Sequence, residues 1–242
     1  MKRRDILTGG LAAGAALALP LRALAQSMPE QSLPEQFDKA FGLIKEPLQP
    51  AAEVPPVPVE PALPTEIIPN PAYDRRVLEI AQREVARAGN ALWRRDVVGI
   101  ADFARPSTLP RLHFANLESG TIRSYYVAHG RGSDPEHSGF LQNFSNSYGS
   151  EATSRGAYLT AEWYQGKYGT SIRLLGLDQD NSAALERAIV MHPAWYAAPG
   201  MIARQGKLGR SEGCFAMAPN QFNEALWHLS GGRLLFSDRI EV

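Results

Sequence analysis

The chain has 242 residues, and 25 lysines and arginines balance 25 aspartates and glutamates, so the formal net charge at pH 7 is zero. This balance gives no electrostatic case for binding nucleic acid or for a polybasic membrane anchor. The single cysteine excludes a disulfide framework and a multi-cysteine zinc site. The length provides one well-buried domain with room for appended segments.

Residues 1–25 have the three parts of a cleaved signal peptide. A basic start at Lys2-Arg3-Arg4 precedes a short apolar run, and Ala23-Leu24-Ala25 has the small residues of a cleavage site that follows Ala25. The paired arginines resemble a twin-arginine signal, and an ordinary secretory signal is the alternative. The apolar run is too short for a stable membrane span, and no later segment reaches about 18 apolar residues. We therefore expect an exported protein of the periplasm.

Residues 26–70 are predicted to form a proline-rich tether. Prolines recur from Pro47 onward, and because proline fixes φ and removes a hydrogen-bond donor, they favour an extended chain over helix or sheet. Phe37, Phe41 and Ile44 form an exception, since their spacing places them on one face of a short amphipathic helix. Such a tether would let a domain reach a cell wall, or would wrap the surface of that domain.

Residues 71–242 are predicted to form one β-rich domain that begins with a helix. Asn70 and Pro71 suit a helix start and Gly89 a helix end, so this helix spans 71–88. Residues 130–157 lack periodicity, which predicts a long loop. The predicted strands are 97–103, 111–117, 121–128, 158–163, 171–175, a strand ending at Met191, and 233–237, and a second helix spans 219–229. Strands without β-α-β alternation indicate a mainly β fold, a sandwich with a few peripheral helices.

The segment Gly209–Met217 contains Cys214, the one cysteine of the chain. In an exported protein, a lone thiol favours a nucleophile, although most free cysteines are small buried hydrophobic side chains. Gly213 lets the backbone approach a substrate closely, and the amides of Gly213 and Cys214 suit an oxyanion hole. Ser211 is placed to hydrogen-bond a neighbouring imidazole and so to orient it.

His192 is the candidate base for this thiol. It follows an apolar run that predicts a buried strand, and it precedes Cys214 by 22 positions. A returning loop of this length can place the imidazole beside the sulfur, as general base and, once protonated, as electrostatic partner of the thiolate. The alternative is a histidine that only caps a strand end. Arg210 would favour the thiolate, and Glu212 would oppose it.

The order of a histidine, a spacer and then Ser-x-Gly-Cys resembles the L,D-transpeptidase catalytic domain, also called the YkuD domain. A divergent branch, the murein L,D-transpeptidase catalytic domain family, resembles the whole stretch from Ala101 to Phe236. The matching pieces are Val127-Ala128-His129-Gly130-Arg131, Phe144-Ser145-Asn146, Tyr164-Gln165-Gly166-Lys167, Arg187-Ala188-Ile189-Val190, Ala194-Trp195-Tyr196 and Leu208-Gly209-Arg210-Ser211. The resemblance implies a mixed-strand β-sandwich with the cysteine loop at one edge.

The resemblance also implies two-step acyl transfer on peptidoglycan stem peptides, which act as donor and acceptor. Cys214 would attack the carbonyl of the L-centre of a diamino acid, release a terminal D-alanine and form a thioester. An amine of a second stem would then form an L,D-crosslink, a step in cell-wall remodelling and cell shape. Attack by water would instead make the protein an L,D-carboxypeptidase or endopeptidase. No metal or organic cofactor is required, and we expect a monomer.

Several other residues are candidates for binding the substrate. Arginine forks bind carboxylates, which the stems carry, and this favours Arg131 and Arg210. The remaining candidates are Trp195 and Tyr196 as a pocket wall, Asn146 and Ser145 as hydrogen-bonding partners of a stem amide, and His129 at the end of a strand. For each of them the alternative is a structural role in the core, a loop or the surface.

The sequence departs from the main transpeptidase pattern at Pro193, at Glu212 and at Phe215-Ala216-Met217. Glycine, histidine and an arginine- or asparagine-containing tail are usual there, so the stem position that reacts is open. These departures support one further alternative, an inactive wall-binding or scaffold domain. Sortases, NlpC/P60-type endopeptidases and zinc peptidases are disfavoured, because their motifs or their order of cysteine and histidine differ from this chain.

Overall fold

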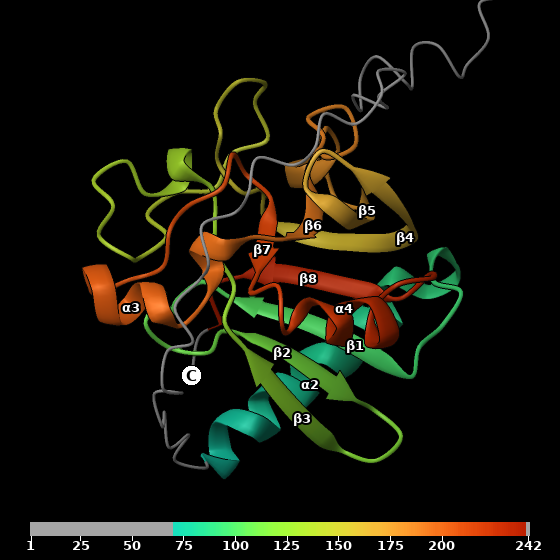
Figure 1. The fold of residues 1–242 in the computed structure, drawn as a ribbon. Helices are drawn as coiled ribbons and strands as arrows, with labels where there is room; N and C mark the ends of the chain where they lie inside the picture. Colours follow the sequence, from blue (N-terminus) through green and yellow to red (C-terminus); the bar gives the residue numbers. More distant parts are fainter. Residues whose placement is uncertain (1–69, 241–242) are drawn as a thin grey trace, which may run out of the picture. The chain divides into compact units, whose positions relative to one another are not determined.

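In the computed structural model, which describes residues 70–240, eight strands form one curled mixed sheet in the order β3-β2-β1-β8-β4-β5-β6-β7 (Figure 1). The strands are β1 Val97–Asp102, β2 Leu112–Asn116, β3 Thr121–Tyr125, β4 Gly156–Gly166, β5 Gly169–Gly176, β6 Val190–Pro193, β7 Phe215–Met217 and β8 Leu234–Asp238. The predicted mainly β fold is confirmed. The long loop is also present, between β3 and β4, and it contains the 3-10 turn η3, Arg131–Ser133.

Helix α2, Pro71–Ala88, has the predicted bounds, because its start and end signals are local. The Asn70 side chain accepts a hydrogen bond from the Tyr73 amide at 3.1 Å, and Gly89 ends the helix with a φ of 53°. The other helices are α3 Gly200–Gln205 and α4 Phe222–His228, with 3-10 turns η2 Gly89–Ala91, η4 Gln179–Asn181 and η5 Trp195–Ala197. Helix α3 and turn η5 lie in the segment for which the sequence predicts only a spacer.

Apolar side chains cover both faces of the sheet. In β1 they alternate, so that Val97 and Ala101 belong to one core cluster and Val98 and Ile100 to the other. The first cluster includes residues of α4, and the second includes residues of α2. Every residue of β1 is therefore buried, which is why this strand reads as a continuous apolar run.

The end of the sheet that carries the candidate residues is made by β5, β6 and β7. Strand β6 pairs antiparallel with β5, with Ile172 opposite Met191. It pairs parallel with β7, with Met191 opposite Phe215 and His192 opposite Ala216. Because β7 is the last strand in the sheet, the cysteine loop that enters it lies at an edge, as the family resemblance implies.

The predicted signal peptide, and the predicted tether with its short amphipathic helix, lie outside the residues that the structure describes, apart from Asn70 at the tether's end. The boundaries drawn there stay predictions. From Asn70 to Ile240, no helix has both the length and the apolar character needed to cross a membrane.

Candidate active site

Cys214 directly precedes β7, and His192 lies in the neighbouring strand β6. Met191 and Phe215 are opposite each other and point into the core. Side chains alternate along a strand, so His192 points to the other face of β6. Within the described range no hydrogen bond joins the side chains of Cys214 and His192. The Cys214 thiol instead donates to the Ala188 carbonyl at 3.6 Å.

Burial favours the protonated form of the Cys214 thiol. The residue is only 7% exposed, and burial raises the pKa of the thiol to about 11. The Glu212 carboxylate also raises this pKa, whereas a hydrogen bond with the Val190 backbone and the Arg187 guanidinium lower it. A nucleophile of this kind needs a base to take its proton during attack.

His192 is a neutral imidazole with a defined tautomer. Its Nδ1 lies 3.0 Å from the Pro193 carbonyl, and because a carbonyl only accepts, Nδ1 carries the proton and Nε2 is the basic nitrogen. Burial lowers the pKa of the ring. The Tyr168 ring stacks on it, with centroids 4.3 Å apart and planes at 21°. In the resting state burial therefore disfavours the imidazolium form, and the role of His192 as general base and partner of the thiolate stays a prediction.

Ser211 shapes the cysteine loop and does not orient the imidazole. Its hydroxyl donates to the Cys214 carbonyl at 2.6 Å and accepts from the Gly213 amide at 3.2 Å. Its own carbonyl accepts the Arg131 amide at 2.8 Å. The predicted oxyanion donor Gly213 is thus occupied in this state, and its amide must leave Ser211 before it can bind a substrate.

Both the backbone conformation and the close surroundings at position 213 require a glycine. Its φ is 114°, a region that side chains with a Cβ rarely adopt, and an added Cβ would lie 2.9 Å from the Ala152 carbonyl oxygen. On the other side of the loop, a Cβ on Gly130 would lie 2.7 Å from the Gly213 nitrogen. The cysteine loop therefore runs directly against the long loop between β3 and β4.

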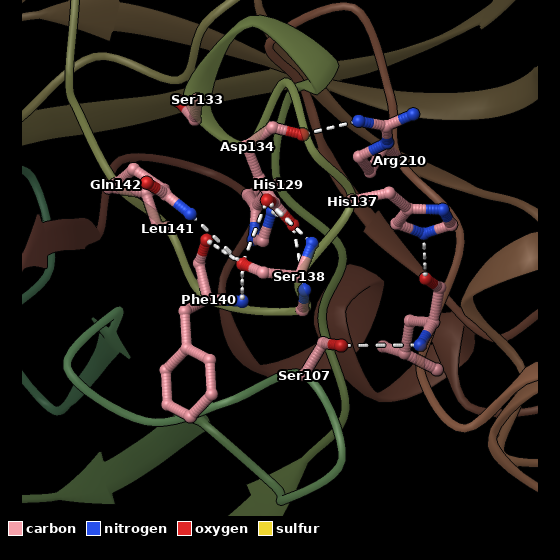
Figure 2. Close-up of polar contacts among 12 residues, drawn as sticks. Ser107, His129, Ser133, Asp134, His137, Ser138, Phe140, Leu141, Gln142 and Arg210 are labelled. Carbon is pink, nitrogen blue, oxygen red and sulfur yellow. Dashed lines mark hydrogen bonds and ion pairs between the residues drawn. The ribbon is translucent and has the colours of Figure 1, made fainter.

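His129 is buried beneath that long loop, in the network that Figure 2 shows. Arg111 Nη2 lies 2.7 Å from His129 Nδ1, and because a guanidinium only donates, His129 Nε2 carries the proton and faces Asp134 Oδ2 at 3.5 Å. Burial lowers the pKa of His129 to about 3. Asp134 also accepts the amides of Ser138 and Gly139. This arrangement corresponds to the structural alternative for His129.

The two predicted carboxylate binders already have acceptors. Arg131 directs its fork at Glu151 and lies 3.6 Å from Glu212. Arg210 donates to the carbonyls of Asp134 and Pro135, the latter at 3.0 Å. A substrate carboxylate that binds either arginine must therefore compete with these partners.

The aromatic candidates lie in turn η5, which follows the strand of His192. Trp195 is 58% exposed and meets Tyr196 edge to face, with centroids 5.9 Å apart. Burial raises the pKa of Tyr196. A Cβ on Gly209 would lie 2.6 Å from the Tyr196 Cβ, so the start of the cysteine loop packs closely on this aromatic residue.

Asn146 and Ser145 fasten the long loop to the segment before β6. The Asn146 amide donates to the Gln179 carbonyl and to the Ser182 hydroxyl, each at 3.0 Å. The Ser145 carbonyl accepts from Arg187 at 2.7 Å. In this state both residues make contacts inside the protein.

Sequence reasoning gave no site role to Tyr168 or Arg187, which contact the site from other elements. Tyr168 lies in the turn between β4 and β5, and Arg187 in the turn before β6. Arg187 belongs to one of the pieces that match the family, but its role, like that of Tyr168, depends on contacts that only the fold makes. Across residues 70–240, no group of three or more histidine, cysteine, aspartate and glutamate side chains could hold a metal ion.

Three solved structures share features with this chain at low identity. An L,D-transpeptidase from Mycobacterium smegmatis is 14% identical, with 59% of this chain and 58% of that chain covered and a TM-score of 0.37. L,D-transpeptidase 1 from Mycobacterium tuberculosis is 11% identical, with 59% and 61% covered and a TM-score of 0.33. The helical cell shape determining protein Pgp2 from Campylobacter jejuni is 13% identical, with 67% and 56% covered and a TM-score of 0.40. The chain thus spans less than two thirds of each of these proteins.

A comparison with curated protein sequences found no match. The family model for the L,D-transpeptidase catalytic domain matches residues 70–237. This match covers well over half of the chain and includes β1 to β7, both candidate catalytic residues and all but the last residue of β8. The chain therefore belongs to the family of L,D-transpeptidase catalytic domains.

Proposed function

We propose that this protein transfers acyl groups between peptidoglycan stem peptides, with Cys214 as nucleophile and His192 as general base. One observation carries the proposal: in a domain of this family, the thiol directly precedes β7, and the paired strand β6 carries an imidazole with a basic Nε2. The proposal includes export to the periplasm, where the stems are found.

The first half-reaction forms a thioester. Cys214 Sγ attacks the carbonyl carbon of the L-centre of a diamino acid while its proton passes to His192 Nε2. The amide of Cys214, joined by that of Gly213 once it leaves Ser211, stabilises the tetrahedral oxyanion. The bond to the terminal D-alanine then breaks, and the imidazolium returns the proton to the departing amine.

The second half-reaction uses an amine of another stem. This amine attacks the thioester carbonyl, His192 takes its proton, and the sulfur leaves as a thiol, so that an L,D-crosslink forms and the enzyme is restored. If water attacks, the product is a trimmed stem with a new carboxylate. Limited water access to the thiol favours the amine, and Cys214 is 7% exposed.

The base is needed because the thiol does not ionise on its own. With a pKa of about 11, about one thiol in ten thousand is ionised at pH 7. Proton transfer to His192 must therefore accompany attack, and substrate binding must bring the two side chains into hydrogen-bonding geometry. On the substrate side, Arg131 and Arg210 remain the proposed carboxylate binders, with Trp195 and Tyr196 as the proposed wall.

An inactive wall-binding domain is the second candidate function. One feature of the resting geometry, the position of the thiol, favours it. The thiol is buried and bonded to the Ala188 carbonyl, with no hydrogen bond to the imidazole in the described part of the chain. A structural thiol would show the same features.

Mass spectrometry of muropeptides separates these functions. Purified disaccharide-tetrapeptide is incubated with the mature protein, with Cys214→Ala, with His192→Gln and with His228→Gln, a matched control at a 42% exposed histidine side chain. We expect a dimer with loss of D-alanine from the wild type and the control, and from neither active-site variant. Tripeptide alone would show a carboxypeptidase. The same dimer from Cys214→Ala would contradict the mechanism, and no product from any protein would favour the binding domain.

A further inference from the structure

Arg187 lies directly beneath the cysteine loop. A Cβ added to Gly213 would lie 3.5 Å from Arg187 Nη2, so the guanidinium faces the residue before the nucleophile. The next residue along the chain, Ala188, provides the carbonyl that accepts the Cys214 thiol at 3.6 Å. One turn of backbone therefore contacts the cysteine loop through both a side chain and a carbonyl.

This turn has a fixed geometry. The Ala188 amide donates to Leu185 at 3.0 Å and the Ile189 amide to Ala184 at 2.9 Å, which is the pair of hydrogen bonds of a Schellman motif. Glycine usually occupies the left-handed position of this motif, but here Ala188 does, with a φ of 54°. The strained residue is the one whose carbonyl meets the thiol, and strain of this kind gathers at functional sites.

The Arg187 guanidinium is held by uncharged acceptors. Nη1 donates to the Ser145 carbonyl at 2.7 Å and to the Ser154 hydroxyl at 2.6 Å. Nη2 donates to the Ser150 hydroxyl at 3.0 Å and to the Ala152 carbonyl at 2.6 Å. By contrast, the fork of Arg131 on the same loop meets a carboxylate. Because the four partners of Arg187 carry no net charge, its positive charge is not neutralised by them.

We propose that Arg187 is a positioning residue of the acyl-transfer site. Its guanidinium holds the loop from Ser145 to Ser154 against Gly213, and its charge stabilises the anion that forms at Cys214 during the reaction. This inference rests on the proposed function, because it assigns the charge a role in thiol chemistry. His192 cannot provide that charge before attack, since its imidazole is neutral and bonded to Pro193.

The other titratable groups around the thiol do not replace it. Glu212 on the cysteine loop opposes the thiolate, as do Tyr158 and Tyr164 on β4 and Tyr196 on η5 if they ionise. Arg187 has the opposite effect and lowers the pKa of Cys214. The position of the Arg187 side chain and its positive charge thus both support a role in stabilising the thiolate.

The test measures the rate of alkylation of Cys214 by iodoacetamide as a function of pH, in the wild type and two variants. Arg187→Gln removes the charge but keeps hydrogen-bond donors, and Arg187→Lys keeps the charge but loses the fork. We expect Arg187→Gln to move the pH midpoint upward and to slow alkylation at neutral pH about tenfold, the effect of one pKa unit. Arg187→Lys should keep an alkylation rate close to that of the wild type at pH 7–8, where the lysine carries its charge.

Arg239→Gln is the matched control, because Arg239 also donates to loop carbonyls, those of Leu141 and Gln142, at 2.8 and 2.5 Å. Its alkylation profile should be unchanged. An unchanged profile in Arg187→Gln would overturn the proposal, and so would a Lys variant slowed as much as the Gln variant at pH 7–8. If Arg187→Gln does not fold, the Lys variant alone still decides, since a tenfold slower alkylation at pH 7–8, where the lysine is charged, contradicts a role for charge.

Alkylation needs no substrate, so the two proposals fail separately. A charge-dependent shift in a protein without muropeptide products would leave the role of Arg187 intact and remove the transpeptidase. Muropeptide products, together with an alkylation profile that does not change with the charge at position 187, would support the transpeptidase and remove the role of Arg187.

Discussion

Burial favours the neutral form of both the Cys214 thiol and the His192 imidazole. It raises the pKa of the thiol and lowers that of the imidazole, so the resting state favours the proton on sulfur. The pair differs in this respect from a preformed thiolate–imidazolium pair. Such a resting state protects a lone thiol from oxidation, since the thiolate is the species that reacts.

The buried thiol should make stability depend on pH in the alkaline range. The folded pKa of about 11 exceeds the ordinary value of 9.0, so the folded state holds this proton longer than the unfolded state. The stabilisation is fully present below pH 9 and is lost as the pH rises toward 11. At pH 10.5 the wild type should have lost roughly 2 kcal/mol of unfolding free energy relative to Cys214→Ala.

Urea unfolding of both proteins at pH 7.5 and pH 10.5 measures this difference. The comparison with Cys214→Ala cancels the tyrosines, whose pKa values are also raised by burial, because both proteins contain them. A difference in unfolding free energy that stays constant between the two pH values would show that the thiol is not buried as described.

At the scale of elements, the hairpin of β4 and β5 contributes to the site through the turn that joins the two strands. Tyr168 in that turn stacks on His192, and burial is the main cause of the lowered pKa of the imidazole. Tyr168→Ala should expose the His192 ring and raise the pKa of this imidazole toward the ordinary value of 6.5. The base is then protonated at higher pH, so the acid limb of the pH–rate profile should move upward.

NMR titration of the histidine ring protons, with D-alanine release as the activity, checks this prediction. Trp227→Ala is the control, because Trp227 lies on α4 and is 80% exposed. Both readouts should be unchanged in it. An acid limb that stays in place in Tyr168→Ala would mean that the Pro193 carbonyl and the strand alone set the state of the imidazole.

The elements also show what the sequence can predict. Helix α2 was predicted with its bounds, because Asn70, Pro71 and Gly89 act locally. Strand β7 was not predicted, because a strand of three residues is defined by its pairing with β6 and not by its own pattern. Cys214 and His192 were chosen as candidates through their order in the chain, and their roles stay predictions. Arg187 was named only within a matching family segment and Tyr168 not at all, because each reaches the site only through tertiary contacts.

At the scale of the whole molecule, the sheet joins distant parts of the chain, which no local pattern predicts. Strand β1 pairs parallel with β8, so that Val98 lies opposite Leu234. Helix α2 then covers one face of these central strands through Tyr73, Val77 and Ile80. The domain that folds should therefore begin at the cap of α2, and the preceding tether should not be part of its core.

Two truncations test this division. Removal of residues 26–69 should leave the melting temperature of the domain and D-alanine release from soluble muropeptides unchanged, since Asn70 still caps α2. Removal of residues 26–88 should abolish folding. The loss of Tyr73, Val77 and Ile80 alone removes roughly 2 kcal/mol of burial each, a large part of the 5–15 kcal/mol that stabilises a typical domain. Lost activity in the shorter truncation, with an unchanged melting temperature, would show that the tether builds part of the site. If the protein without residues 26–69 is as active as the full chain on intact cell-wall sacculi, the tether has no role in reaching the wall.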